Sequence, residues 1–155
     1  MTTPYVLQPD AGRRLDLGNF AAVVLADSAA TGGAFSVLRA EREPPGFGPP
    51  LHVHRDAAEA FYVLSGEYRM FVEEGSELCP AGSFVYVPRG VVHTFTVVSE
   101  EPGTKLNLFS PAAMVGFFEE LADAEAAGTA TPEVLDAIAG RHEMDVVGPV
   151  PEGYL

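Results

Sequence analysis

Three histidines and one glutamate at strand-like spacing constrain this chain more than any other feature of its sequence. His52 and His54 are separated by one residue, so on a strand both side chains point to the same face. Glu59 follows across a turn at the start of the next expected strand, and His93 opens a much later one. A fold that uses these four side chains together must place strands that are distant in sequence opposite one another.

Composition and turn signals favour an all-β fold around these residues. Glycine and proline contribute 16 and 13 of the 155 residues, which favours many short strands over a helical bundle. Turn signals recur at short intervals between apolar runs, as is typical of a sandwich or barrel. The expected strands cover residues 20–25, 35–40, 51–54, 60–64, 68–72, 83–87, 92–98 and 105–109. A proline-rich rigid loop is expected at 43–50 and a polar turn at 73–76.

Helical spacing replaces the strand pattern after Pro111. The apolar positions of a first helix are Met114, Phe117, Phe118 and Leu121. Gly128 is its expected C-cap, and Thr131 and Pro132 are the expected N-cap and first residue of a second helix that ends near Gly140 or His142. The tail from Val147 is expected to be extended. We therefore predict a single domain over residues 1–155, with a barrel core at about 20–110 and C-terminal α-helices at about 112–142.

The net charge of −13 narrows the possible partners. Nucleic acid phosphates reward clustered Lys and Arg, so we expect no nucleic acid partner. The same charge argues against anionic membrane surfaces. The first residues show no basic start followed by an apolar core, and the early apolar run at 20–26 is too short to span a bilayer. We therefore expect a cytoplasmic protein that does not associate with membranes.

The ligand types of the histidine and glutamate set indicate a metal. Imidazole and carboxylate groups suit a divalent transition metal. Three imidazoles and one carboxylate leave positions open in an octahedral shell. Open positions are typical of a reactive metal rather than a closed structural one. Manganese, iron, nickel, cobalt, copper and zinc all accept this set, so the ligands alone do not identify the metal.

Two motifs in this region resemble the signatures of the cupin superfamily. The first reads Gly46-x5-His52-x-His54-x4-Glu59-x6-Gly66, and the second reads Gly82-x5-Pro88-x-Gly90-x2-His93. The resemblance covers Gly46 to about Val97, and it implies a jelly-roll β-barrel (a double-stranded β-helix) with a metal inside. Carried over residue by residue, it makes His52, His54, Glu59 and His93 the metal ligands. Gly66 and Gly90 would permit turns that strain other residues.

The chain departs from the second motif at Val97, where the family usually has asparagine. Asparagine at this position is not normally a ligand, so metal binding should survive. Alternation along the strands places Phe61 and Val63 on the side of Glu59, and Phe95 and Val97 on the side of His93. We predict that these four residues line the substrate pocket, although each would serve equally as barrel core. Basic strand residues are few, which favours an apolar or aromatic small-molecule substrate.

The whole chain most resembles small single-domain bacterial cupins that include quercetinase-like dioxygenases. This resemblance implies a metal-dependent dioxygenase acting on an aromatic or enolic small molecule, with Glu59 as both ligand and catalytic base. Two alternatives stay open: a non-oxidative metal-dependent isomerase, cyclase or decarboxylase, and a non-enzymatic small-molecule binding cupin. Family habit also implies a homodimer.

Overall fold

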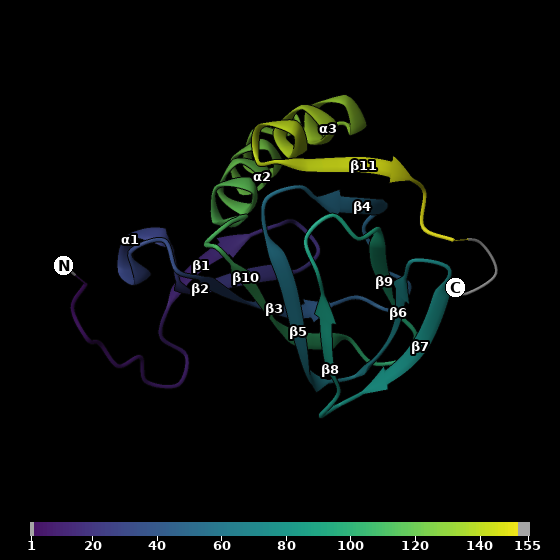
Figure 1. The fold of residues 1–155 in the computed structure, drawn as a ribbon, viewed down its shortest axis with the longest axis horizontal. Coiled ribbons are helices and arrows are strands. Elements are labelled where there is room, and N and C mark those ends of the chain that lie inside the picture. The colour runs from purple at the N-terminus through teal and green to yellow at the C-terminus, as the bar shows by residue number, and fades with distance from the viewer. Residues whose placement is uncertain (1, 152–155) are drawn as a thin grey trace.

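Two antiparallel sheets face each other in the structure, a computed structural model that describes residues 2–151 (Figure 1). The first sheet has the order β1 (Arg13–Asp16), β2 (Ala21–Ala26), β3 (Ser36–Glu43), β10 (Gly103–Ser110), β5 (Ala58–Ser65) and β8 (Phe84–Val87). The second has the order β11 (Met144–Gly148), β4 (Leu51–His54), β9 (His93–Val97), β6 (Glu67–Val72) and β7 (Gly75–Pro80). The strands that neighbour each other in space are mostly distant in sequence, which is the jelly-roll arrangement that the motifs imply.

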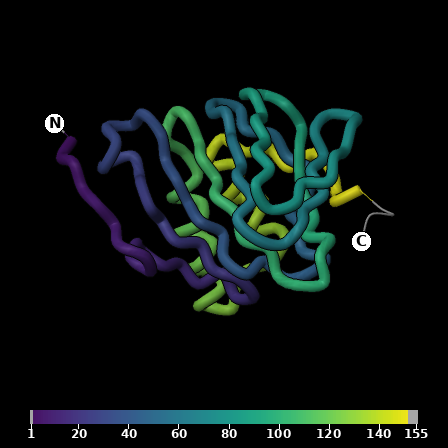
Figure 2. Tube along the Cα trace, turned by 90° about the horizontal axis from the view of Figure 1, so that it is seen from below, coloured from purple at the N-terminus to yellow at the C-terminus, as the bar shows by residue number. Residues whose placement is uncertain are grey.

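Alternating burial determines which side chains fill the space between the sheets. Along β10, Lys105, Asn107 and Phe109 are buried while the residues between them are partly or fully exposed. Glu59, Phe61 and Val63 alternate in the same way on the neighbouring strand β5. Figure 2 shows β1 and β2 at one edge of the molecule and the β6–β7 hairpin at the opposite edge.

The C-terminal helices cover one end of the two sheets (Figure 1). α2 (Val115–Ala127) is capped at its C-terminus by Gly128 in the left-handed conformation. α3 (Pro132–Arg141) is capped at its N-terminus by Thr131, whose hydroxyl accepts a hydrogen bond from the Val134 backbone N–H. Both caps were expected from the sequence. A short helix, α1 (Ser28–Thr31), lies between β2 and β3. Among the described residues, no helix is both long and apolar enough to cross a membrane.

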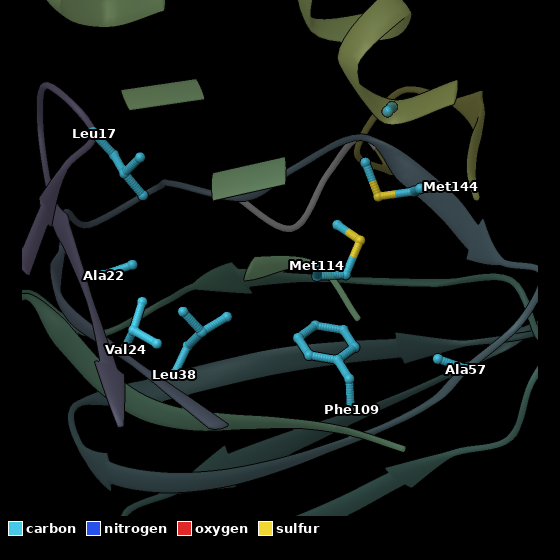
Figure 3. Close-up of a cluster of buried hydrophobic side chains, with 9 residues drawn as sticks. Leu17, Ala22, Val24, Leu38, Ala57, Phe109, Met114 and Met144 are labelled. Atoms are coloured by element: carbon cyan, nitrogen blue, oxygen red, sulfur yellow. The ribbon is translucent and has the colours of Figure 1, made fainter. Parts of the chain in front are cut away.

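The helices pack on an apolar cluster at this end of the molecule. Figure 3 shows most of its side chains gathered between the strands and the helices. Met114 precedes α2 and Met144 begins β11, and both side chains lie above Phe109 of β10. The cluster consists of Leu17, Ala22, Val24, Leu38, Ala57, Phe109, Met114, Ala139 and Met144.

Three strands lie where the sequence predicted none. β7 occupies residues partly assigned to a polar turn at 73–76, and β1 and β11 extend the sheets beyond the predicted core at 20–110. β1, β7 and β11 are all edge strands, and their outer faces are solvated, so the alternation of apolar residues that marks an inner strand is weak in them. Part of the predicted extended tail forms β11, and residues 152–155 of that tail lie outside the described residues.

Gly66 and Gly90 offer a matched test of how the barrel turns depend on glycine. Both have positive φ, at 74° and 78°. A Cβ on Gly66 would lie 2.8 Å from the Gly103 Cα, whereas a Cβ on Gly90 would meet nothing within 4 Å. We expect Gly90→Ala to lower the free energy of unfolding by about 1–2 kcal/mol, the cost of the left-handed conformation. Gly66→Ala should cost clearly more, because the backbone of a neighbouring turn must also shift.

Urea unfolding of the two variants and the wild type, followed by circular dichroism, would measure both costs. Equal losses in the two variants would contradict the close packing at Gly66.

Candidate metal centre

The four side chains singled out in the sequence meet inside the molecule, between the two sheets. Their potential ligand atoms all lie within 4.8 Å of one another, and all four residues are buried. His52 and His93 are direct partners in the β4–β9 pairing, and their ring centroids are 4.4 Å apart. His54 follows on the same face of β4, whereas Glu59 comes from β5 in the opposite sheet. The site therefore joins the two sheets.

Hydrogen bonds to backbone carbonyls orient two of the imidazoles. His52 Nδ1 lies 2.8 Å from the Pro50 carbonyl oxygen, and His93 Nδ1 lies 2.9 Å from that of Val91. An Nδ1–H that donates to a carbonyl leaves Nε2 as the unprotonated nitrogen of the neutral ring. The His52 ring can thus present a lone pair to a metal, whereas His93 Nε2 must first give up the proton that it donates to Glu59 Oε2.

Glu59 directs one carboxylate oxygen at the histidines. Its Oε2 lies 2.9 Å from the Nε2 atoms of both His54 and His93. Burial alone would raise the pKa of Glu59, but the hydrogen bonds and charges of the two histidines hold that pKa well below its usual range. The carboxylate is therefore ionised, which is the form that binds a metal.

The pKa values of His52 and His93 are shifted in opposite directions. Burial, followed by the neighbouring His93, lowers the pKa of His52 to about 4. Burial also acts to lower the pKa of His93, but the hydrogen bond to Glu59, the charge of Glu59 and the hydrogen bond to Val91 together raise it. His52 is therefore a neutral imidazole at neutral pH, ready to act as a ligand. A buried set of three imidazoles and one carboxylate fits a divalent transition metal.

Two apolar clusters enclose this polar layer. On the helix side, the Phe109 ring packs edge-on at 5.3 Å from the His54 ring. On the other side, the Phe61 ring centroid lies 6.2 Å from that of His93. The second cluster consists of Phe61, Val63, Tyr68, Met70, Cys79, Val87, Phe95 and Val97. All four predicted pocket residues, Phe61, Val63, Phe95 and Val97, belong to this cluster and are buried in it.

A recess of about 330 Å³ reaches His54 from the helix end. Its lining comes from the turn after β4, the segment before α2 and the end of α3, and sequence reasoning did not find it. The lining residues are His54, Asp56, Ala57, Pro111, Ala112, Ala113, Met114, Arg141, His142 and Glu143. His142 caps α3, as expected from the sequence, and its Nε2 lies 2.6 Å from Glu120 Oε2.

The barrel interior also holds polar groups where the sequence predicted a largely apolar pocket. Glu43, Lys105 and Asn107 are buried, and Asn107 Nδ2 donates to Glu59 Oε1 at 3.1 Å. Sequence analysis missed Asn107, and it placed Glu43 in a rigid loop, whereas Glu43 is the last residue of β3. A signal was present, since Lys105 and Asn107 alternate on one strand and must share a face.

Comparisons with known proteins agree with the site and the fold. The Cupin domain family model matches residues 40–109. Quercetin 2,3-dioxygenase of Bacillus subtilis (strain 168) is 32% identical over 97 residues, which are 62% of this chain and 28% of that protein. This chain therefore matches well under half of the relative's length.

Two solved structures share the fold at low sequence identity. An RmlC-like cupin from Shewanella frigidimarina NCIMB 400 superposes with a TM-score of 0.60 at 21% identity, covering 71% of this chain and 93% of that one. KdgF from Halomonas sp. gives a TM-score of 0.56 at 17% identity, with 63% and 86% covered. The family match therefore identifies a Cupin domain at residues 40–109, and the two solved structures show that the fold is shared.

Proposed function

We propose that this chain is a metal-dependent dioxygenase of the quercetinase type, acting on an aromatic or enolic small molecule. The observation that carries the proposal is the meeting of three histidines and Glu59 in one buried cluster. The 32% identity to a quercetin 2,3-dioxygenase supports the reaction class. A divalent transition metal bound by these residues would supply Lewis-acid and redox chemistry toward an enolic oxygen.

The chain's own residues have three roles in this proposal. His52, His54, His93 and Glu59 Oε2 hold the metal. Glu59 is also the base that takes the proton of an enolic hydroxyl, and its Oε1 accepts a hydrogen bond from Asn107. The substrate approaches through the recess that reaches His54.

The apolar surroundings of the centre favour an aromatic substrate. Phe61 and Phe95 form an edge-to-face pair with centroids 6.0 Å apart, and Val63 and Val97 pack beside them. In the proposal these four residues form the inner wall of the site and exclude water from it. A low-dielectric wall strengthens each polar contact that the substrate makes at the metal ligands.

Removing one ligand tests the metal centre. We expect His93→Ala to reduce bound metal from about one equivalent to near zero, because the imidazole that faces Glu59 across the cluster is lost. The barrel should stay folded, since both apolar clusters are intact. Elemental analysis after loading and dialysis would measure the metal, and circular dichroism the fold. His142→Ala is the control and should keep its metal; full occupancy in His93→Ala would refute the assignment.

Oxygen uptake tests the reaction. Protein loaded separately with each candidate metal is given a panel of flavonols, and dissolved oxygen is followed with an electrode. We expect flavonol-dependent uptake with a redox-capable metal and none with His93→Ala. Bound metal without uptake on any flavonol would refute the quercetinase-type assignment and favour a non-oxidative enzyme or a binding protein. Product analysis would then distinguish a non-oxidative enzyme from a binding protein.

A further inference from the structure

A chain of buried polar side chains leads away from Glu59 on the side opposite the histidines. Asn107 Nδ2 donates to Glu59 Oε1 at 3.1 Å, and Lys105 Nζ donates to Asn107 Oδ1 at 3.1 Å. Lys105 Nζ also donates to Glu43 Oε1 at 2.8 Å, and the Tyr68 hydroxyl donates to the same oxygen at 2.8 Å. The chain crosses from β5 through β10 to β3 and β6, so it is built from both sheets.

The two oxygens of Glu59 have separate partners. Oε2 faces the Nε2 atoms of His54 and His93, while Oε1 faces only the Asn107 amide among the hydrogen bonds of the described residues. A carboxylate can bind a metal through one oxygen or through both. A donor that holds Oε1 on the far side of the carboxyl group opposes the rotation that would bring both oxygens to the metal.

Lys105 determines which way the Asn107 amide points. The ammonium group can only donate, so the Asn107 oxygen must face it and the Asn107 nitrogen must face Glu59. Lys105 is itself held firmly, since it is only 1% exposed and its Nζ lies 4.1 Å from the centroid of the Phe95 ring as well as 2.8 Å from Glu43. Lys105, which does not itself contact Glu59 through a hydrogen bond, therefore sets the direction of the Asn107 amide toward Glu59.

A fully buried ion pair is a poor way to stabilise a barrel. Apolar residues of similar volume often replace such a pair with no loss of stability or with a gain, because the charges lose their hydration. The buried Lys105–Glu43 pair lies beside this apolar cluster, with Lys105 Nζ over the rings of Tyr68 and Phe95. What this pair supplies, and an apolar pair would not, is a fixed hydrogen-bonding direction at Asn107.

We propose that Asn107, oriented by Lys105 and Glu43, is a positioning residue that holds Glu59 as a metal ligand through Oε2 alone. This inference rests on the proposed metal centre at His52, His54, Glu59 and His93. By keeping Oε1 away from the metal, the amide leaves coordination positions free for substrate. The barrel interior thus controls how many positions the centre offers.

Cobalt(II) binding tests the proposal, because its visible absorption responds to coordination number and geometry while chelator competition gives its affinity. Two variants independently remove the hold of the Asn107 amide on Glu59 Oε1. Asn107→Leu removes the amide at similar volume, and the double variant Glu43→Gln/Lys105→Met removes the charged pair but keeps Asn107. We expect both to bind cobalt about 10- to 100-fold more weakly, as is usual when a hydrogen-bond partner of a ligand is lost. Both should also share one altered spectrum.

Leu38→Ala is the matched control. Leu38 is the register partner of Asn107 on β3 and is also buried, but it belongs to the apolar cluster on the helix side. This variant should lose stability yet keep the wild-type cobalt spectrum and affinity. A purely structural role for the polar chain predicts that all three variants behave alike.

The outcomes separate this proposal from the proposed function. Wild-type affinity and spectrum in Asn107→Leu, or in the double variant if Asn107→Leu does not fold, would overturn the role of Asn107 and leave the metal centre standing. Absence of cobalt from the wild-type protein, or full binding by His93→Ala, would overturn the metal centre and this inference with it.

Discussion

The buried carboxylate of Glu59 is the constraint around which this molecule is arranged. An ionised group between two sheets loses its hydration, at a cost that only hydrogen bonds and opposite charge can offset. Here the compensation comes from both sides: imidazoles from β4 and β9 face one oxygen, and the Asn107 amide from β10 faces the other. The two sheets can close on each other only if these strands arrive in register.

The position of the centre between two apolar clusters follows from the same constraint. Phe109 separates the histidines from the helix end, and Phe61 separates them from the far end of the barrel. The cluster that contains Phe61 excludes water from its side of the polar layer, so that the charges inside interact strongly with each other. The recess at His54 is then the place where a small molecule can approach the centre from the helix end.

Much of the ligand arrangement and of the helix boundaries could be predicted from local sequence. The i, i+2 spacing of His52 and His54 places them on one face whatever the wider fold, and the caps at Gly128 and Thr131 depend only on nearby residues. The polar chain behind Glu59 could not be found in the same way. Glu43 lies beside prolines and glycines that suggest a loop, and only the pairing of β3 with β10 brings it to Lys105. Alternation shows that Lys105 and Asn107 share a face, but it does not show which face is buried.

The pairing of β11 with β4 gives the helices a connection to the metal centre. Met144 is opposite His54 in this ladder and Val146 is opposite His52, so the strand that carries two of the ligands is an inner strand only because the residues after α3 return to it. Displacement of β11 would therefore leave β4 at the edge of its sheet, with backbone groups beside two of the ligands unpaired.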